Sequence, residues 1–510
     1  MKLKLQYIYL LLFVIAAYCL LPMTNSDYLY AIQDNNVFIS GHTFMVDTVT
    51  NEGGWLVWVA CYLTQFLYYP WLGSSLLIAM WTLIYLMTIH LFCLKDKSSP
   101  LALILPGILL FNLLDYGYWI YAAKTPGYPF QPTLVALFIL LCSVLAHPLL
   151  KHSKYGSHLG KALPVTLCCL FCALCCILIW KPQRRNILNN HHCSILTTLT
   201  DKNFKHELRM YRAIDESNYE EVLAEWKKVK TAPTNLMVMF KNIALMHTGR
   251  LTDMFKTNNC GQKPETSDTL QERISQLAAP LIYYQFGQIN YAYRWAMENS
   301  VKYGQSFRNL KMMAQCAIFN GEFDVAMKYL TLLNTSTFHK NWAREHEAWI
   351  MNSTRFIQSQ DFQKIAPLIN DDVNMLDNDE GDCKQYILNH FANLLHAATP
   401  QLEEVIMCLS LWTEDEYAFC VHFYDYVQKH PNEAIPQLYQ QGAILLGTTE
   451  SSPITLDKFR FDAVVSERYN QFAQDFNQLT RQGMDAKEMA KRLKPQYGDT
   501  YWWYYYFTNY

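Results

Sequence analysis

Two acidic residues follow the first apolar run of the chain, at a place where they could do chemistry beside a membrane. The run stops near Pro22, and Asp27 and Asp34 come directly after it in the stretch LLPMTNSDYLYAIQDNN, residues 20–36. A carboxylate held at a membrane surface can act as a general base or bind a metal ion. The same acids can instead simply solvate the outer lip of an anchor, and this second interpretation is the one that we favour.

A cluster of cysteines, CCLFCALCC, offers a different chemistry. Cys168, Cys172 and Cys175 would share one face of a helix, where thiolates could bind a soft metal. However, a thiol in the middle of a membrane resists ionisation, and the run between Cys168 and Cys176 contains no histidine or acid. Small, polarizable side chains at a helix–helix contact explain the stripe more simply, so we predict no metal or cofactor there.

Other combinations of metal ligands lack the necessary spacing. Six of the fifteen cysteines are scattered through the second half without CxxC pairs, and the histidines of NNHHCS, residues 189–194, would point apart on a helix. His339 and His346 do not form an HExxH motif, and no P-loop, GxSxG or GxGxxG arrangement stands out. The formal net charge of -2 gives no indication of a nucleic-acid partner.

The elements that must position these residues divide the chain into two halves. No lysine or arginine occurs between Lys4 and Lys95, whereas charged residues are frequent from Lys202 onward. Charged residues make up 17% of the chain, compared with about 25% in ordinary soluble domains. We therefore expect an all-α protein with a transmembrane domain over residues 1–190 and a water-soluble helical domain over residues 200–500.

About five apolar segments are long enough, or nearly so, to span a bilayer, which takes about 20 residues of helix. They are predicted near residues 7–22, 72–94, 101–121, 134–150 and 163–180. The first follows Lys2 and Lys4 and precedes no A-x-A cleavage site, so we expect an uncleaved anchor. Asp115 interrupts the third among aromatic neighbours, which places it at the rim of the membrane.

Lysines in the short loops predict the orientation of these spans. Lys95, Lys97 and the lysines of residues 151–161 are expected in the cytoplasm, whereas residues 23–54 carry four acids and no base and are expected outside. The aromatic segment GGWLVWVACYLTQFLYYPW, residues 53–71, would invert every later loop if it crossed. We interpret it as a helix lying on the outer surface, which leaves the second half of the chain outside. A sixth span at this segment is the alternative, and the basic residues after the last apolar run favour it.

A turn signature recurs in the second half of the chain. SNYEEV, GRLTDM, GQINYA, GEFDVA and QDFQKI each have an apolar or aromatic residue at the third place and an apolar residue at the sixth. They begin at residues 217, 249, 287, 321 and 360, so their spacings are 32, 38, 34 and 39 residues. This is the period of a helix–turn–helix solenoid.

The segment LKMMAQCAIFNGEFDVAMKYLTLLN resembles a tetratricopeptide repeat. Ala314 and Ala317 lie on its first helix, Gly321 makes the turn, and Ala326 lies on its second helix. The resemblance implies an α-solenoid with a concave face that can bind a protein or peptide.

The chain ends in YWWYYYFTNY, residues 501–510, with eight aromatic residues in ten. Aromatic side chains at this density seldom face water. Two arrangements are open: the tail returns to the membrane interface or the spanning half, or it forms a last element that plugs the end of the solenoid.

The N-terminal layout is similar to that of polyprenyl-sugar-dependent, multispanning glycosyltransferases. These enzymes place an acid after the first span and follow it with an interfacial helix. The resemblance implies that Asp27, with Asp34 and Asp115 as further acids, acts as a base or binds a divalent metal during attack on an anomeric carbon. This sequence departs from those families in its smaller number of spans and in lacking an adjacent Asp–Glu pair.

The whole layout resembles an uncharacterised family of bacterial polytopic membrane proteins with tetratricopeptide-like C-terminal regions, and this resemblance implies no activity. We predict a membrane-anchored interaction or scaffold protein of the bacterial cytoplasmic membrane, with its second half in the periplasm. Its partners would be membrane lipid and a protein or peptide, and it would need no cofactor. The alternative is a glycosyltransferase-like membrane enzyme that uses a lipid-linked sugar, with a divalent metal.

Overall fold

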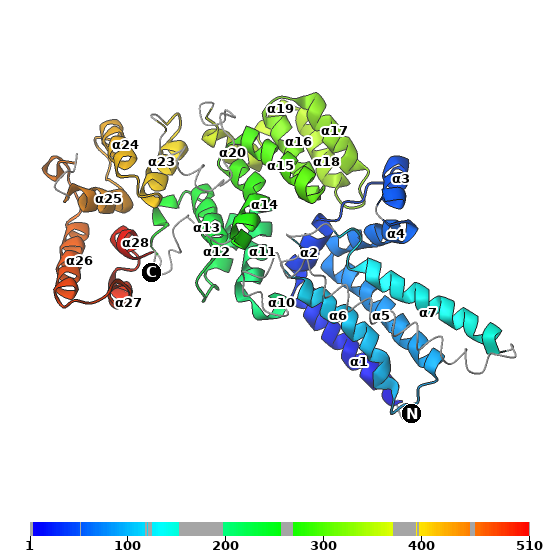
Figure 1. Ribbon diagram of the computed structural model, residues 1–510. Coiled ribbons are helices and arrows are strands. Elements are labelled where there is room, and N and C mark those ends of the chain that lie inside the picture. The colour runs from blue at the N-terminus through cyan, green and yellow to red at the C-terminus, as the bar shows by residue number, and fades with distance from the viewer. Residues whose placement is uncertain are drawn as a thin grey trace. The chain divides into compact units, whose positions relative to one another are not determined.

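The computed structural model describes residues 4–51, 53–117, 120, 125–151, 197–256, 269–370, 394, 397–448 and 454–508, and every regular element in these ranges is a helix (Figure 1). The all-α prediction is therefore confirmed for this part of the chain. Contacts between the helices define two compact units. Unit 1 consists of Met1–Leu208, Met297–Gln315 and Glu322–Ala348, and unit 2 consists of Arg209–Ala296, Cys316–Gly321 and Trp349–Tyr510.

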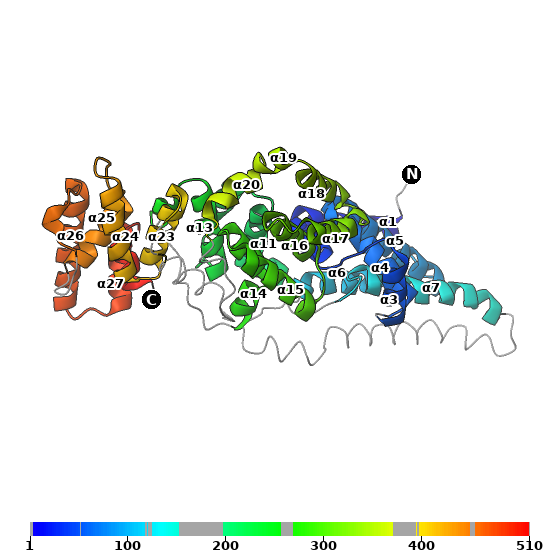
Figure 2. The ribbon, with the colours of Figure 1, turned by 90° about the horizontal axis from the view of Figure 1, so that it is seen from above.

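Unit 1 contains a bundle of apolar helices. They are α1 (Leu5–Tyr18) with its π-helical continuation η1 (Cys19–Met23), α5 (Pro70–Phe92), η3 (Ser99–Leu103) with α6 (Ile104–Tyr116), and α7 (Phe130–Lys151). Helix α5 contacts α1, α6 and α7, and Figures 1 and 2 show the four helices side by side. Because α5 contacts three neighbours, it forms the centre of the bundle.

Three helices of this bundle are long and apolar enough to cross a membrane: Leu5–Met23, Pro70–Phe92 and Ser99–Tyr116. Two shorter apolar helices, Trp55–Tyr68 and Phe130–Ala146, accompany them. The predicted spans near residues 7–22, 72–94, 101–121 and 134–150 each overlap one of these apolar helices in its described part. The predicted span at 163–180, together with the cysteine cluster and residues 189–194, lies outside the described residues.

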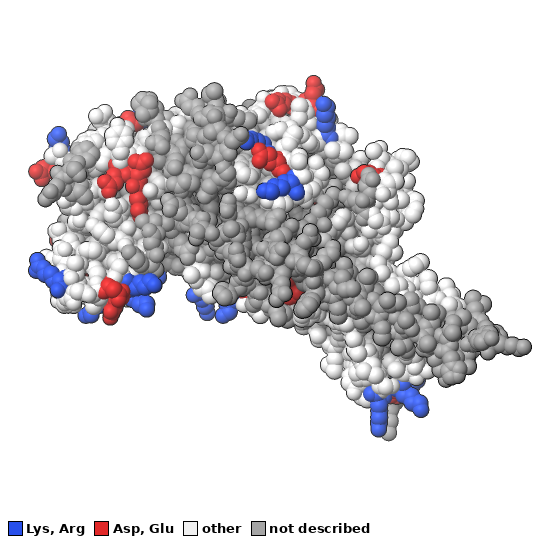
Figure 3. Space-filling view, in the orientation of Figure 1, with Lys and Arg blue, Asp and Glu red and all other residues white. Residues whose placement is uncertain are grey.

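The surface of the bundle is typical of a membrane protein. Large apolar side chains such as Leu11, Leu12 and Leu145 are exposed on its helices, whereas Lys95 and Lys97 lie at the end of α5. Figure 3 shows basic side chains gathered at the end of the bundle where the N-terminus lies, and a mainly uncharged surface on the described atoms beyond it. An apolar belt with basic residues at one end is the pattern of a helical membrane bundle.

Short helices gather at the other end of the bundle (Figure 1). They are α2 (Ser26–Asp34), α3 (His42–Asn51), α4 (Trp55–Thr64) and η2 (Gln65–Tyr68). Pro70 starts the next helix, because its fixed φ suits the first turn and it needs no hydrogen bond there. The aromatic segment 53–71 therefore divides into a short helix and the beginning of α5.

Unit 1 also takes up helices from the second half of the chain. They include α10 (Thr197–Thr200), the first part of α11 (Lys202–Asp215), the end of α15 (Ile289–Tyr303), most of α16 (Phe307–Phe319), α17 (Phe323–Asn334) and most of α18 (Lys340–Met351). The carbonyl groups at the end of α6 are capped by side chains: Tyr28 Oη donates to Leu113 O at 2.8 Å, and Thr198 Oγ1 donates to Leu114 O at 2.6 Å.

Unit 2 is built from the remaining helices. They are the end of α11, α12 (Tyr219–Trp226), α13 (Asn235–His247), η5 (Leu251–Asp253), α14 (Thr269–Gln285), the first part of α15, the ends of α16 and α18, α19 (Ser353–Ile357), α20 (Gln360–Ile365), η6 (Ala366–Leu368), α23 (Pro400–Trp412), α24 (Glu416–Lys429), α25 (Gln437–Gly447), η7 (Leu456–Lys458), α26 (Ala463–Arg481), α27 (Ala486–Tyr497) and α28 (Tyr501–Phe507).

The first four turn signatures share one backbone geometry. Their first residues, Ser217, Gly249, Gly287 and Gly321, all have a left-handed φ, between 54 and 74°. At the first three, the next N–H donates back across the end of the preceding helix, for example Arg250 N to Leu245 O at 2.7 Å, which is the Schellman motif. The fifth signature differs, because its first residue already lies in α20.

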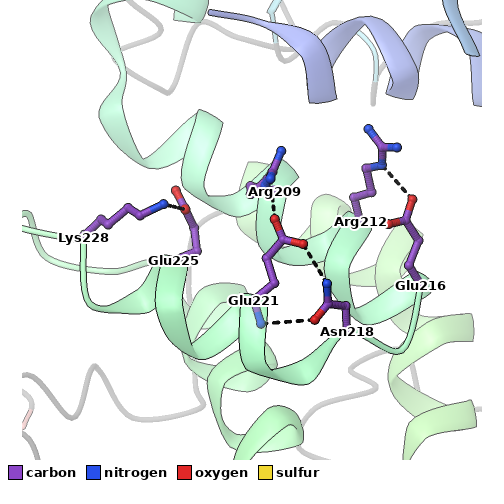
Figure 4. Close-up of polar contacts among 7 residues, drawn as sticks. All are labelled: Arg209, Arg212, Glu216, Asn218, Glu221, Glu225 and Lys228. Atoms are coloured by element: carbon purple, nitrogen blue, oxygen red, sulfur yellow. Dashed lines mark hydrogen bonds and ion pairs between the residues drawn. The ribbon is translucent and has the colours of Figure 1, made fainter. Parts of the chain in front are cut away.

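Polar contacts reinforce the first of these turns (Figure 4). The side chain of Asn218 accepts from the N–H of Glu221 at 3.4 Å, which caps α12, and donates to the Glu221 carboxylate at 2.9 Å. Glu221 also pairs with Arg209 on the preceding helix, and Arg212 Nε lies 2.8 Å from Glu216 Oε1. The ion pair of Arg209 with Glu221 ties α11 to α12 across the turn.

The aromatic tail forms helix α28 and lies in the core of unit 2. Tyr501, Trp502 and Tyr504 are almost completely buried. The indole N–H of Trp502 donates to Gln441 O at 3.0 Å, and Tyr504 Oη donates to Trp412 O at 3.1 Å. Of the two arrangements that the sequence left open, the structure has the second kind: a last element packed into the helical unit.

Candidate functional site

The three acids that the sequence selects occupy different environments in unit 1. Asp27 lies half-buried in the first turn of α2, and Asp115 lies half-buried near the end of α6. Asp34, the last residue of α2, is only 3% exposed. The expectation that both early acids are solvated is therefore wrong for Asp34, because a neighbouring element covers it.

Asp34 is covered by the beginning of α16. Its Oδ1 accepts from the backbone N–H of Arg308 at 3.0 Å, and its Oδ2 lies 3.6 Å from Arg308 Nη1. The N–H groups in the first turn of a helix have no partner within the helix, and the helix dipole favours a negative charge there. Asp34 therefore caps α16 and pairs with a side chain of the same helix.

A buried network of amides lies next to this ion pair. Gln33 Nε2 is 3.3 Å from Gln65 Oε1 and 3.2 Å from His339 Nε2. Gln65 Nε2 in turn donates to Asn36 O at 2.6 Å, and Asn36 Oδ1 accepts from the N–H of Gly127 at 2.8 Å. The network joins α2, η2 and the loop before α7 to the loop before α18.

Aromatic rings surround the network. Phe338 stacks on Tyr68 with ring centres 5.5 Å apart and also touches Phe66. His339 stacks on Phe307 at 4.0 Å and meets Tyr68 edge-on at 5.2 Å. Burial, with a smaller effect from Lys311, lowers the pKa of His339 to about 2, so this imidazole is neutral near pH 7.

The ion pair of Asp34 with Arg308 and the amide network around Gln33 form a junction between α2 and the helices α16 and α18. Its chemistry is that of a packed polar contact between segments of unit 1. In the described part of the chain, no group of three or more His, Cys, Asp or Glu side chains is placed to hold a metal ion, so Asp27, Asp34 and Asp115 do not form such a group. Asp27 and Asp115 nevertheless lie on neighbouring elements, because Tyr28 donates to Leu113 O.

Sequence reasoning missed the residues that complete this junction. Arg308 and His339 lie 274 and 306 residues from their partners Asp34 and Gln33. No local pattern marks them, since an arginine at a helix start and a histidine before a helix are ordinary. Tyr68 and Tyr69 are the signal in the sequence, but their pattern predicts a membrane interface belt rather than a contact with Phe338.

Comparison with known proteins supplies a family. No curated protein and no solved structure matches the chain. One protein family does match, over residues 2–153 and again over residues 119–508, so that both the apolar bundle and the helical second half are included. The chain therefore belongs to the family described as "Family of unknown function (DUF6057)".

Proposed function

We propose that this protein is a membrane-anchored interaction or scaffold protein that presents a helical-repeat region to a protein or peptide partner. The observation that carries the proposal is that unit 2 is made of helices joined by recurrent Schellman turns, while unit 1 contains the apolar helices of an anchor. Repeated helix pairs stack into extended surfaces that bind other chains. The four matching turns support a tetratricopeptide-like solenoid.

Exposed apolar side chains on α24 support a partner of this kind. Tyr417 is 78% exposed and Val421, one turn later on the same face, is 37% exposed. Large apolar side chains on one exposed face are typical of an interaction site. We infer that this face of α24 contributes to the surface that the partner contacts.

The proposed location is the bacterial cytoplasmic membrane, with the helical second half in the periplasm. The basic residues at the N-terminal end of the bundle support an orientation with that end in the cytoplasm. Helix α4 supports an interfacial position: it exposes Trp55, Val59 and Tyr62 while it buries Val57 and Cys61. An exposed aromatic face beside a membrane bundle suits contact with lipid head groups.

A glycosyltransferase-like enzyme acting on a lipid-linked sugar is the second candidate. One observation favours it: α2 and the end of α6 are joined by the bond from Tyr28 to Leu113, so Asp27 and Asp115 lie on adjacent elements at the end of the bundle. In that case Asp27 would act as the base or bind a divalent metal.

Variants at Asp27 and on the exposed face of α24 distinguish a scaffold from an enzyme. In a strain without its own copy of the gene, Asp27→Asn should restore the wild-type phenotype if the protein is a scaffold, and the double variant Tyr417→Ser, Val421→Ser should not. If the protein is an enzyme, Asp27→Asn should fail to restore the phenotype and the double variant should restore it. Immunoblots of the membrane fraction establish that each variant is inserted at the wild-type level.

In addition, a photoreactive residue at position 417 should give a discrete cross-linked adduct, whereas one at the exposed Lys487 should not.

A further inference from the structure

The contacts around Asp34 join the first loop of the protein to a segment almost three hundred residues later. We propose that the N-terminal end of α16 and the loop before α18 form a clamp on α2 and η2. The clamp holds the second half of the chain on the same side of the membrane as residues 24–54. This inference does not depend on the proposed function, because it applies equally to a scaffold and to an enzyme.

The charges at this contact require the two segments to meet. The side chains of Asp34 and Arg308 are 5% and 17% exposed. A buried carboxylate without a partner is costly, so Asp34 depends on the cap and the ion pair that α16 provides. The α2 helix starts three residues after η1 ends, so this acid lies close to the end of the first apolar helix. The beginning of α16 must reach the same place.

Two further contacts place the chain beyond α16 on the same side. The N–H of Ser40 donates to Thr335 O at 3.3 Å, and Phe338 packs between Phe66 and Tyr69, with ring centres 5.7 and 5.4 Å away. These contacts involve the loop after α2 and the end of η2. The clamp therefore has three independent points of attachment.

The same region indicates that residues 53–71 do not cross the membrane. Phe38 touches both Trp58 and Tyr62, with ring centres 5.5 and 5.3 Å apart, and Gln65 Nε2 donates to Asn36 O. Helix α4 and the start of η2 thus pack along residues 36–38, directly after α2. The continuous helical stretch Trp55–Tyr68, with the 10 residues of α4 and the 4 of η2, is about 21–23 Å long, which is shorter than the hydrocarbon core of about 30 Å.

The arrangement requires an even number of membrane crossings between α2 and α16. Helix α5 leads away from the clamp to Lys95 and Lys97, and α6 leads back to Tyr28. If residues 53–71 crossed as well, all later loops would change sides, and α16 would lie across the membrane from Asp34. The clamp is compatible with the five predicted spans and incompatible with the sixth.

Paired cysteines test the clamp in the full-length protein. Ser40 and Thr335 are exposed, and the hydrogen bond between their backbones brings them within the usual reach of a disulfide. In sealed membrane vesicles, Ser40→Cys and Thr335→Cys should each react with a membrane-impermeant thiol reagent from the same side, above the background of the unmodified protein. The double variant should give a cross-linked peptide on oxidation, identified by mass spectrometry. Lys97→Cys with Thr335→Cys is the matched pair that should give none.

The charge at the clamp supplies a second readout. Arg308→Glu should abolish the cross-link between positions 40 and 335, whereas Arg344→Glu, at an exposed arginine of α18, should leave it unchanged. Labelling of positions 40 and 335 from opposite sides would overturn the proposal. So would the absence of a cross-link when both thiols are labelled from the same side.

Discussion

Asp27 and Asp34 belong to one helix of nine residues and yet have different surroundings. Asp27 precedes the tyrosine that caps α6, whereas Asp34 is buried and caps α16. Because seven residues are close to two helical turns, the side chains leave α2 on the same side, about 10 Å apart. The two side chains differ in burial because the beginning of α16 covers Asp34 and not Asp27.

The first prediction concerns this pair of acids. Asp34→Asn keeps an oxygen that can accept from the N–H of Arg308 but removes the charge opposite its guanidinium. We expect it to lower the free energy of unfolding by about 1–3 kcal/mol. Asp27→Asn, in the half-buried first turn, should cost less than about 1 kcal/mol. Denaturant titrations in detergent measure both, and equal losses would contradict the role of Asp34 in the clamp.

The second prediction concerns His430 in unit 2. Its Nε2 is 2.9 Å from Glu403 Oε2 and its Nδ1 is 3.2 Å from Glu433 Oε1. The hydrogen bonds to Glu403 and then to Glu433 raise the pKa of His430 above its usual value. A raised pKa in the folded state contributes stability that is fully present below the unfolded pKa of about 6.5 and is lost as the pH rises through the folded pKa.

Replacement of His430 should therefore have a pH-dependent effect. We expect His430→Gln to lower the melting temperature more at about pH 5.5 than at about pH 8.5, because only the protonated imidazole attracts the two carboxylates. Thermal unfolding at the two pH values measures the difference. In a Glu403→Gln background most of it should disappear, and an equal loss at both pH values would exclude a charged His430.

At the scale of elements, the turns of unit 2 are held by glycines in a left-handed conformation. Gly287 and Gly321 have φ values of 74 and 72°. A Cβ on Gly287 would lie 2.7 Å from the carbonyl carbon of Leu368 and 2.8 Å from its oxygen, whereas a Cβ on Gly321 would meet nothing within 4 Å. The two turns share a backbone shape but only the first is packed against another backbone.

The third prediction compares these glycines. Gly321→Ala should cost about 1–2 kcal/mol, which is the price of the left-handed conformation alone. Gly287→Ala adds a clash with backbone atoms that cannot rotate away, so its cost should be about 2–5 kcal/mol. Unfolding of both variants under the same conditions gives the comparison. A smaller loss at Gly287 than at Gly321 would contradict the close approach of Leu368.

At the scale of the whole molecule, the sequence allows two orientations. They differ in the side of the membrane on which the second half of the chain lies. The fourth prediction uses reporters fused after Lys97 and at the C-terminus. Alkaline phosphatase should be active only at the C-terminus, and a fluorescent protein should fluoresce only after Lys97, because basic loops stay in the cytoplasm. Phosphatase activity after Lys97 would reverse the proposed orientation, but the clamp would still require the C-terminus and residues 24–54 to share a side.

The sequence by itself determined the helices and the turns. Apolar runs without charges predict helices such as Pro70–Phe92, since a helix satisfies its own backbone hydrogen bonds in an apolar environment. The signature at Gly249 predicts its turn, since a single residue without a Cβ can adopt the left-handed backbone. Such information is local, and it can be recognised without knowing what packs against the segment.

Only the tertiary structure decided what covers these elements. Asp34 was expected to be solvated and is buried by a helix 274 residues away, and Trp502, whose place the sequence left open, is buried in unit 2. Aromatic residues near Tyr68 were expected to meet lipid, and Tyr68 stacks on Phe338. The physical reason is that the desolvation of a charge or a ring depends on distant partners, and their spacing along the chain is not constrained by any local pattern.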